Sequence, residues 1–406
     1  MAEPDGLKAP VTAAVAGTFA VQTLAAVAMH CIPVFAPAAA IDYGIPETQV
    51  GLFTAIIFAG ALSSGLVSGA FVARYGAMRV CQLAMVSAAI GLAFFTLALP
   101  WAAVISAVLI GFNYGPINPA SSHVLFKVTN PKNRPFIFSL KQTGVPMGAG
   151  FAGLAVPALI TLYDWQTATL ILAGLALLTA LAVQPIRAAL DSDRRPGTVL
   201  FGGGTGIIAP VRMLLADPVI RRLSLIAFSY AGAQASIAAF LVVYLTIDTG
   251  FTLAQAGAAY AVSQAGAVAG RIFWGGIAGR VVPTRRVLAG QGILTGSCLL
   301  LTAAFATDWP LAAILPVCLV LGTSAYGWNA LYLSEIASLA PPGQISAVTG
   351  GAQVFMFGAG IFYAPLFGGL AALTGDFTIP YLVIAGLTLA AGTYGFFLPR
   401  DTAISN

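Results

Sequence analysis

Two positively charged residues lie inside long apolar stretches, where ionised side chains are rare. Lys141 falls in the stretch 136–161 and Arg271 in the stretch 252–279. A charge at that depth in a bilayer carries a penalty of at least ~2.5–3.5 kcal/mol and usually has a partner of opposite sign. All thirteen acidic residues fall in loops, tails or the ends of apolar stretches, with Glu335 the deepest. We infer that the missing negative charge is a small bound anion.

The two cations offer different chemistry to an anion. Lysine supplies a compact charge, whereas arginine can hold a carboxylate with two parallel hydrogen bonds. Lys141 lies about 9 Å inside its stretch at 1.5 Å per helical residue, so its side chain can alternatively extend to the inner surface. Arg271 can alternatively brace a helix end or bind backbone carbonyls.

Further polar residues occur in the apolar stretches and predict a polar interior. Gln264 precedes Arg271 by two helical turns and therefore shares its face. Each of these residues can instead form a hydrogen bond between helices. The predicted substrate-binding set, besides Arg271 and Lys141, is Asn113, Tyr114, Asn118, Gln142, Gln234, Gln264, Tyr326, Asn329, Tyr332 and Gln353.

Proton coupling requires a titratable group in the pathway, and His30 is the candidate. It lies well inside the first apolar stretch, and histidine changes charge near physiological pH. Lys141 and the substrate's own carboxyl are the other available sites, and His30 can instead be a neutral packing residue. A proton or a counter-anion is the expected coupling species, because no paired carboxylates are placed to bind sodium.

The composition shows which elements must position these residues. Of 406 residues, 59% are hydrophobic and 8% are charged, against about 25% charged in a soluble domain. The mean hydropathy of +0.93 indicates a polytopic membrane protein. A membrane helix needs roughly 20 apolar residues, and twelve such helices are predicted, at 11–38, 48–73, 77–100, 102–126, 136–161, 165–187, 217–246, 252–279, 285–306, 309–337, 344–373 and 377–398.

Charge fixes the orientation of the predicted helices. Alternate connections hold sixteen of the eighteen Lys and Arg residues, and the connections on the opposite side hold none. The positive-inside rule then places both termini in the cytoplasm. The longest break, 188–216, predicts a cytoplasmic linker between an N-terminal six-helix bundle, 1–187, and a C-terminal one, 217–406. We expect a multi-pass protein of the cell inner (plasma) membrane, embedded in the lipid bilayer as a monomer.

The two halves resemble each other. The segment 42–51 matches 248–257 at Asp, Gly, Gln and Gly, an offset of 206 residues, and Gly69 and Arg74 correspond at the same offset to Gly275 and Arg280. The stretch from Gly69 to Arg79, with its counterpart at Gly275 and Arg280, resembles the Gly-x-x-x-Asp-Arg-x-Gly-Arg motif of the major facilitator superfamily. The resemblance extends over essentially the whole chain.

This resemblance implies a fold and a mechanism. It predicts an all-α membrane protein of twelve transmembrane helices in two pseudo-symmetric bundles that work by alternating access. The loop residues Gly69, Arg74, Arg79, Gly275 and Arg280 would then form conformational gates. Ala73 and Gly279 replace the motif's Asp, which puts a charge relay there in doubt. In family members that handle organic anions, an Arg near position 271 often binds substrate, so one anion would bridge Lys141 and Arg271 across the cavity.

Other classes of function have little support in the sequence. No nucleophile set, metal-ligand spacing or dinucleotide fingerprint occurs, so we expect no enzyme activity, no cofactor, no metal and no nucleic-acid partner. The expected function is secondary active transport of a small organic anion, such as a carboxylate, by proton symport or anion exchange. The main alternative is efflux of amphipathic drugs or metabolites. A non-transporting sensor and a channel are further alternatives.

Overall fold

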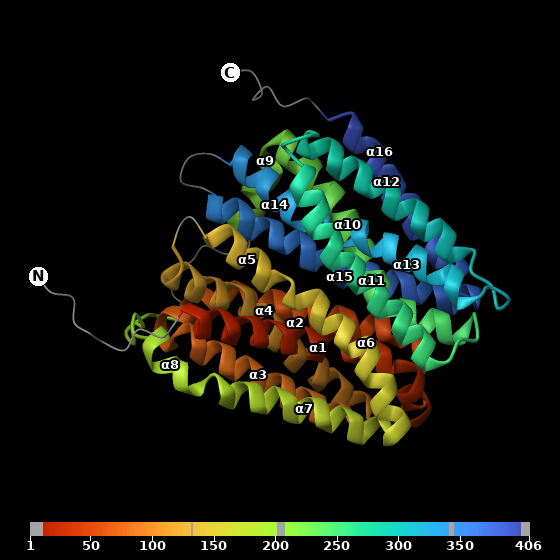
Figure 1. Cartoon of the computed structure of the whole chain (residues 1–406), viewed down its shortest axis with the longest axis horizontal. Helices are drawn as coiled ribbons and strands as arrows, with labels where there is room; N and C mark the ends of the chain where they lie inside the picture. Colours follow the sequence, from red (N-terminus) through yellow and green to blue (C-terminus); the bar gives the residue numbers. More distant parts are fainter. Residues whose placement is uncertain (1–10, 131–132, 201–207, 341–344, 399–406) are drawn as a thin grey trace, which may run out of the picture. The chain divides into compact units, whose positions relative to one another are not determined.

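The protein is built from α-helices. The computed structural model describes residues 11–130, 133–200, 208–340 and 345–398. Within these ranges there is no β-strand, and a single isolated bridge joins Ala278 to Val282. The chain divides into two compact units, Met1–Gly204 and Thr205–Asn406, and each is a bundle of helices (Figure 1).

The first unit contains eight α-helices and one 3₁₀ turn in its described residues. They are α1 (Val11–Tyr43), η1 (Glu47–Gln49), α2 (Val50–Tyr75), α3 (Ala77–Phe95), α4 (Pro100–Val128), α5 (Arg134–Gln142), α6 (Gly144–Leu162), α7 (Trp165–Ala182) and α8 (Gln184–Leu190). The second unit contains another eight helices in its described part. They are α9 (Ile208–Ala216), α10 (Pro218–Ile247), α11 (Leu253–Ile277), α12 (Thr284–Ala303), α13 (Leu311–Ala325), α14 (Trp328–Leu339), α15 (Ile345–Thr374) and α16 (Thr378–Phe396).

The all-helical fold and the twelve predicted spans are confirmed. Every predicted range is occupied by one long helix or by two consecutive ones. Eleven spans in the described residues are long and apolar enough to cross a membrane. The remaining predicted range holds α11, which is 25 residues long and carries the polar residues Gln255, Gln264 and Arg271 within it.

Three predicted spans each contain parts of two α-helices, and in one of them, 165–187, α7 and α8 meet at Val183. The range 136–161 contains the end of α5 and nearly all of α6, which meet at Thr143, and 309–337 contains α13 and α14, which meet at Tyr326 and Gly327. The predicted linker 188–216 also contains the short helix α9.

The two units repeat one packing pattern. In the first unit α1 packs on α6, α2 on α4 and α3 on α7, and in the second α10 packs on α15, α11 on α13 and α12 on α16. Glycine permits the close approach at equivalent crossings. A Cβ added at Gly115 of α4 would overlap the Ala61 carbonyl oxygen of α2, and one added at Gly270 of α11 would overlap the Thr323 carbonyl oxygen of α13. The internal repeat in the sequence is therefore also a structural repeat.

Candidate substrate site

Lys141 is completely buried inside the first unit. It lies in the last turn of α5, with 0% of its surface exposed. Its Nζ donates a hydrogen bond of 2.5 Å to Oδ1 of Asn118 on α4, and the Cys81 thiol of α3 acts on it electrostatically. The amine therefore does not extend to the inner surface, as the alternative interpretation required. Of the polar residues predicted from the sequence, Asn118 is the one that binds it directly.

Other buried or half-buried polar residues of the first unit lie on α1, α4 and α5. Asn113 is fully buried, and its Nδ2 donates to the Ala25 carbonyl at 3.5 Å, while its Oδ1 has no hydrogen-bond partner among the described residues. Gln22 on α1, which the sequence analysis did not select, is also buried, and its Oε1 has no partner there. Tyr114 and Gln142 are half-buried. His30 is buried in the middle of α1, with 8% of its surface exposed.

Arg271 belongs to a polar cluster in the second unit. It is half-buried on α11, two turns after Gln264, of which 2% is exposed. The Arg271 charge acts on the buried hydroxyl of Tyr326, which lies at the junction of α13 and α14. Gln264 and Tyr260 are close to that hydroxyl, but no described group meets the geometry of a hydrogen bond to it. The junction thus presents a phenolic oxygen with unused hydrogen-bonding capacity beside a guanidinium group.

Neighbouring groups hold this junction in place. The indole Nε1 of Trp274, one turn after Arg271, donates to the Thr323 carbonyl at 3.0 Å. Gln291 of α12 is fully buried, and neither of its amide atoms has a hydrogen-bond partner among the described residues. A Cβ added at Gly327 would come within 2.8 Å of the Gln291 amide nitrogen. The sequence analysis missed Gln291, although a lone amide in the apolar stretch 285–306 was a usable signal.

The remaining predicted residues of the second unit are more dispersed. Asn329 is half-buried, and its Nδ2 lies 3.9 Å from the Met356 sulfur. Gln234 on α10 and Gln353 on α15 are also half-buried. The Tyr332 hydroxyl, by contrast, is 2.8 Å from the Ser224 hydroxyl. Its ring lines a small pocket between α10, α12, α14 and α16.

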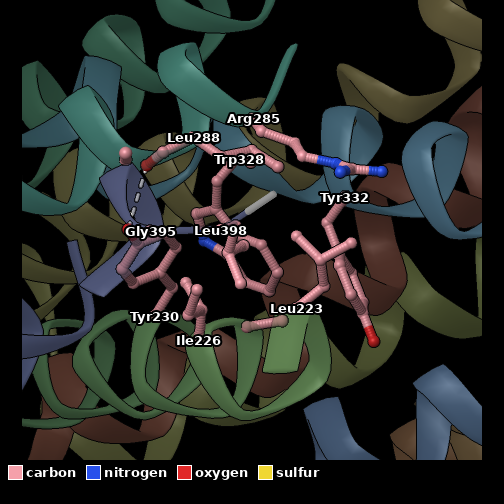
Figure 2. Close-up of a pocket in the computed structure, with 11 residues that line it drawn as sticks. Leu223, Ile226, Tyr230, Arg285, Leu288, Trp328, Tyr332, Gly395 and Leu398 are labelled. Atoms are coloured by element: carbon pink, nitrogen blue, oxygen red, sulfur yellow. Dashed lines mark hydrogen bonds between the residues drawn. The ribbon is translucent and has the colours of Figure 1, made fainter. Parts of the chain in front are cut away.

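Figure 2 shows this pocket, which has an empty volume of about 270 Å³. Trp328, Tyr332 and Tyr230 form aromatic walls, and the Tyr230 hydroxyl donates to the Leu288 carbonyl at 2.9 Å. Arg285 borders the pocket and donates from Nε to Oε1 of Glu335 at 2.6 Å. With its polar groups engaged in this way, the pocket is predominantly apolar.

The loop between α2 and α3, which the sequence analysis predicted to be a gate, receives contacts from the segment after α8. Asp191 is 4% exposed, and its carboxylate accepts hydrogen bonds from the backbone N–H groups of Met78, at 2.8 Å, and Arg79, at 3.0 Å. The Arg195 N–H donates to the Ala73 carbonyl at 2.6 Å. Arg74 donates from its guanidinium group to the Thr198 carbonyl at 3.4 Å. The sequence analysis placed Asp191 in a linker and gave it no role.

Burial and hydrogen bonds shift the pKa values of two carboxylates beside this loop in opposite directions. Burial raises the pKa of Asp191, against the opposing effect of the Met78 and Arg79 N–H groups. Burial alone would raise the pKa of Asp193 as well, but bonds from Lys127 and His123 outweigh it and lower that pKa. These bonds measure 3.0 Å from Lys127 and 2.7 Å from His123. Of the other residues predicted to form gates, Gly69, Gly275 and Arg280 are exposed.

Comparison with known proteins identifies the family. A model of the Major Facilitator Superfamily matches residues 18–365, most of the chain. The chain belongs to this superfamily. Its members are transporters rather than enzymes, and the chain is accordingly a multi-pass membrane transporter. In the described residues, no group of three or more His, Cys, Asp or Glu side chains is arranged to hold a metal ion.

Solved structures of superfamily transporters share the fold of this chain. A bacterial homolog of the human lysosomal transporter Spinster, inward-facing and occupied, has a TM-score of 0.74 and 17% identity, with 97% of each chain covered. The same homolog in its unoccupied form has a TM-score of 0.68 and 16% identity, covering 96% of this chain and 93% of that one. A POT family transporter in complex with 5-aminolevulinic acid has a TM-score of 0.77 and 13% identity, with 96% of each covered. No curated protein sequence matches the chain.

Proposed function

We propose that this superfamily transporter moves a small organic anion, most simply a carboxylate, across the cell inner membrane by alternating access. Arg271 is the charge that holds the anion. The observation that carries this proposal is the cluster of Arg271, Gln264 and Tyr326 at the junction of α13 and α14. A guanidinium group binds a carboxylate with two parallel hydrogen bonds, and the Tyr326 hydroxyl and Gln264 amide add donors beside it.

The distribution of charge supports an anion over a cation. Lys141 places a second basic group inside the first unit, bound to a neutral amide oxygen. Glu335, the deepest described carboxylate, is bound to Arg285 beside the apolar pocket. A cationic substrate would need an acidic group in its site, whereas Tyr326 beside Arg271 and Asn118 beside Lys141 are neutral residues. That a single anion bridges Arg271 and Lys141 remains a prediction, as does the choice between proton symport and anion exchange.

A thermal-unfolding screen of the purified, full-length protein tests the proposal. The panel contains acetate, lactate, oxalate, succinate, benzoate, nitrate and the cation tetraphenylphosphonium. A ligand that binds the folded state alone stabilises it by about 2.7 kcal/mol at one hundred times its Kd. We expect one or more carboxylates to raise the Tm of the wild type and of Arg212→Ala, an exposed control on α9. The same anion should give no shift with Arg271→Ala.

Two results would overturn the proposal. One is stabilisation by tetraphenylphosphonium that persists in Arg271→Ala, which would favour the efflux of amphipathic drugs or metabolites instead. The other is a carboxylate shift of equal size in Arg271→Ala and wild type, which would remove Arg271 from the site. Arg271→Lys refines a positive result. It keeps the charge and loses the two-pronged geometry, so an intermediate shift would identify bidentate binding.

A further inference from the structure

Lys141 is in surroundings that suit an uncharged amine better than an ammonium ion. Its side chain is among the largest that are fully buried. Its one hydrogen bond to a described residue goes to the neutral oxygen of Asn118, and the titratable group that acts on it from the neighbouring helix α3 is the Cys81 thiol. An ammonium group has three N–H donors and repels a dry environment that lacks a counter-charge. One donor is satisfied here, so protonation would leave two donors without an acceptor among the described residues.

The backbone beside Lys141 contains a junction. α5 ends at Gln142 and α6 begins at Gly144, so the amine lies two residues before the connecting residue, Thr143. α6 is anchored on α1, because a Cβ added at Gly148 would overlap the Thr23 carbonyl oxygen. For Lys141 to reach water, the nine-residue helix α5 would have to tilt about Thr143 while α6 stays in place. Such a tilt would carry Lys141 out of its dry site and toward water.

We propose that Lys141, rather than His30, takes up and releases the transported proton, with Asn118 as the group that receives the amine in its uncharged form. When α5 opens, the Nζ lone pair of Lys141 accepts a proton from water and a new N–H bond forms. When the site opens on the other side, that N–H bond breaks and the proton returns to water. The inference rests on the proposed anion transport, since the anion's charge compensates the ammonium during the loaded step.

This arrangement explains how the proton and the anion would be coupled. A protonated Lys141 cannot return to its site beside Asn118 without an anion, because its charge would be buried without compensation. The transporter without bound anion therefore returns to its starting conformation after Lys141 has lost its proton. His30 has no equivalent constraint, since a neutral imidazole is already suited to a buried site. Lys141 is protonated when the anion is bound and uncharged when the transporter returns empty. One proton therefore moves with each anion.

The first test does not depend on a substrate. Thermal unfolding of purified wild type, Lys141→Gln and Lys141→Met is followed from about pH 6 to about pH 9, below the ordinary lysine pKa of ~10.4. The unfolded wild type then carries a proton that the folded protein lacks. Its unfolding equilibrium constant relative to either variant should fall by up to about tenfold per pH unit as the pH rises. A difference that does not change with pH in either variant would overturn the proposal.

The second test separates proton coupling from anion transport. Proteoliposomes containing the full chain are assayed with ¹⁴C-labelled acetate, lactate and oxalate, both for exchange at equal concentrations and for accumulation driven by a pH gradient, acidic outside. Lys141→Gln should lose at least tenfold more of the driven accumulation than of the exchange. Lys141→Arg, which keeps a permanent charge, should also lose driven accumulation, and the control His30→Gln should keep both activities.

The failures of the two proposals can be told apart. Driven accumulation that survives in Lys141→Gln, or that disappears in His30→Gln alone, would overturn the role of Lys141 while anion transport stands. If wild type transports none of the three probes and the unfolding difference depends on pH as expected, anion transport fails instead. The behaviour of Lys141 as an exchangeable proton site would then still be supported.

Discussion

The loops after α2 and α11 have related sequences, yet each recruits a carboxylate from a different part of its unit. Beside the first loop, Asp191 from the segment after α8 binds the backbone N–H groups of Met78 and Arg79 at the start of α3. Beside the second loop, the start of α12 has no side-chain cap, and Arg285 in its first turn forms an ion pair with Glu335 of α14. The superfamily motif that these loops resemble contains an Asp within the loop, and neither loop has this Asp.

This difference shows that a missing motif residue does not mean a missing charge. The sequence analysis doubted a charge relay here because Ala73 and Gly279 replace the Asp. In both units a carboxylate nevertheless reaches the helix that comes after the loop, from residues distant in sequence. The Asp191 cap and the Arg285–Glu335 ion pair should differ in how much stability is lost when each is removed. A carboxylate that caps backbone N–H groups contributes about 1 kcal/mol, whereas breaking a buried ion pair costs about 3–5 kcal/mol.

The largest effect should come from breaking the ion pair of the second unit. Glu335→Ala leaves Arg285 buried without its carboxylate, with both side chains about 10% exposed in wild type. We expect the free energy of unfolding to fall by about 3–5 kcal/mol, measured by titration of the purified protein with denaturing detergent. The double variant Arg285→Met, Glu335→Leu replaces the pair with apolar groups and should be close to wild type. A double variant as unstable as Glu335→Ala would show that the charges themselves are required.

An intermediate effect distinguishes the glycines of the two loops. Gly76 and Gly279 both have positive φ angles, 97° and 72°, so alanine at either position costs about 1–3 kcal/mol of backbone strain. A Cβ at Gly76 would also overlap the Asp191 side chain, whereas the nearest atom to one at Gly279 is Thr284 Oγ1, at 3.5 Å. Gly76→Ala should therefore lower the Tm considerably more than Gly279→Ala.

A double-mutant cycle provides the control for this comparison. In an Asp191→Gly background the overlap with the Asp191 side chain, including its Cβ, is removed, and Gly76→Ala should then cost its backbone strain alone. Interaction energies between residues in contact reach about 0.5–3 kcal/mol. A Gly76→Ala cost that is the same with and without Asp191 would mean that backbone strain accounts for all of it, and that the close packing of Asp191 contributes nothing to the loop.

The sequence predicted the elements well because hydropathy determines where helices cross a bilayer. The range containing α11 was predicted even though Arg271 and two glutamines make it less apolar than the others. The junctions inside 136–161 and 309–337 were not predicted. The second lies within an apolar run, and the polar residues Lys141 and Gln142 before the first were read as parts of one span. Glycine and proline occur throughout these runs, and packing against neighbouring helices decides which of them becomes a junction.

The candidate site was predictable residue by residue, but its contacts were not. Lys141, Asn118, Arg271, Gln264 and Tyr326 are conspicuous because polar groups are costly in a membrane. That Asn118 binds Lys141, and that Tyr326 lies at a helix junction, depends on helix rotation and tertiary packing, which a linear pattern does not specify. Asp191 and Glu335 illustrate the same limit, because each acts on a loop more than 40 residues away in the sequence.

The smallest effects should appear in the pH dependence of the first loop. The folded pKa of Asp191 is raised by burial, so the folded state binds its proton more tightly than the unfolded state does. Wild type should therefore lose stability relative to Asp191→Asn as the pH rises from about 4.5 to about 7, above the ordinary Asp pKa of ~3.9. Asp193 has a lowered pKa and behaves in the opposite way. Its contribution is present above that ordinary value and is lost as the pH falls through the folded pKa.

Unfolding of wild type, Asp191→Asn and Asp193→Asn across this pH range measures both contributions. Asp193 is 41% exposed, and an exposed pair of this kind contributes about 0–1 kcal/mol. The unfolding free energy of Asp193→Asn should therefore stay within that margin of wild type. The difference between the two should not decline above about pH 4. The Asp191→Asn difference should change over the same interval. Parallel curves for the two variants would mean that the Asp191 carboxylate is solvated like that of Asp193.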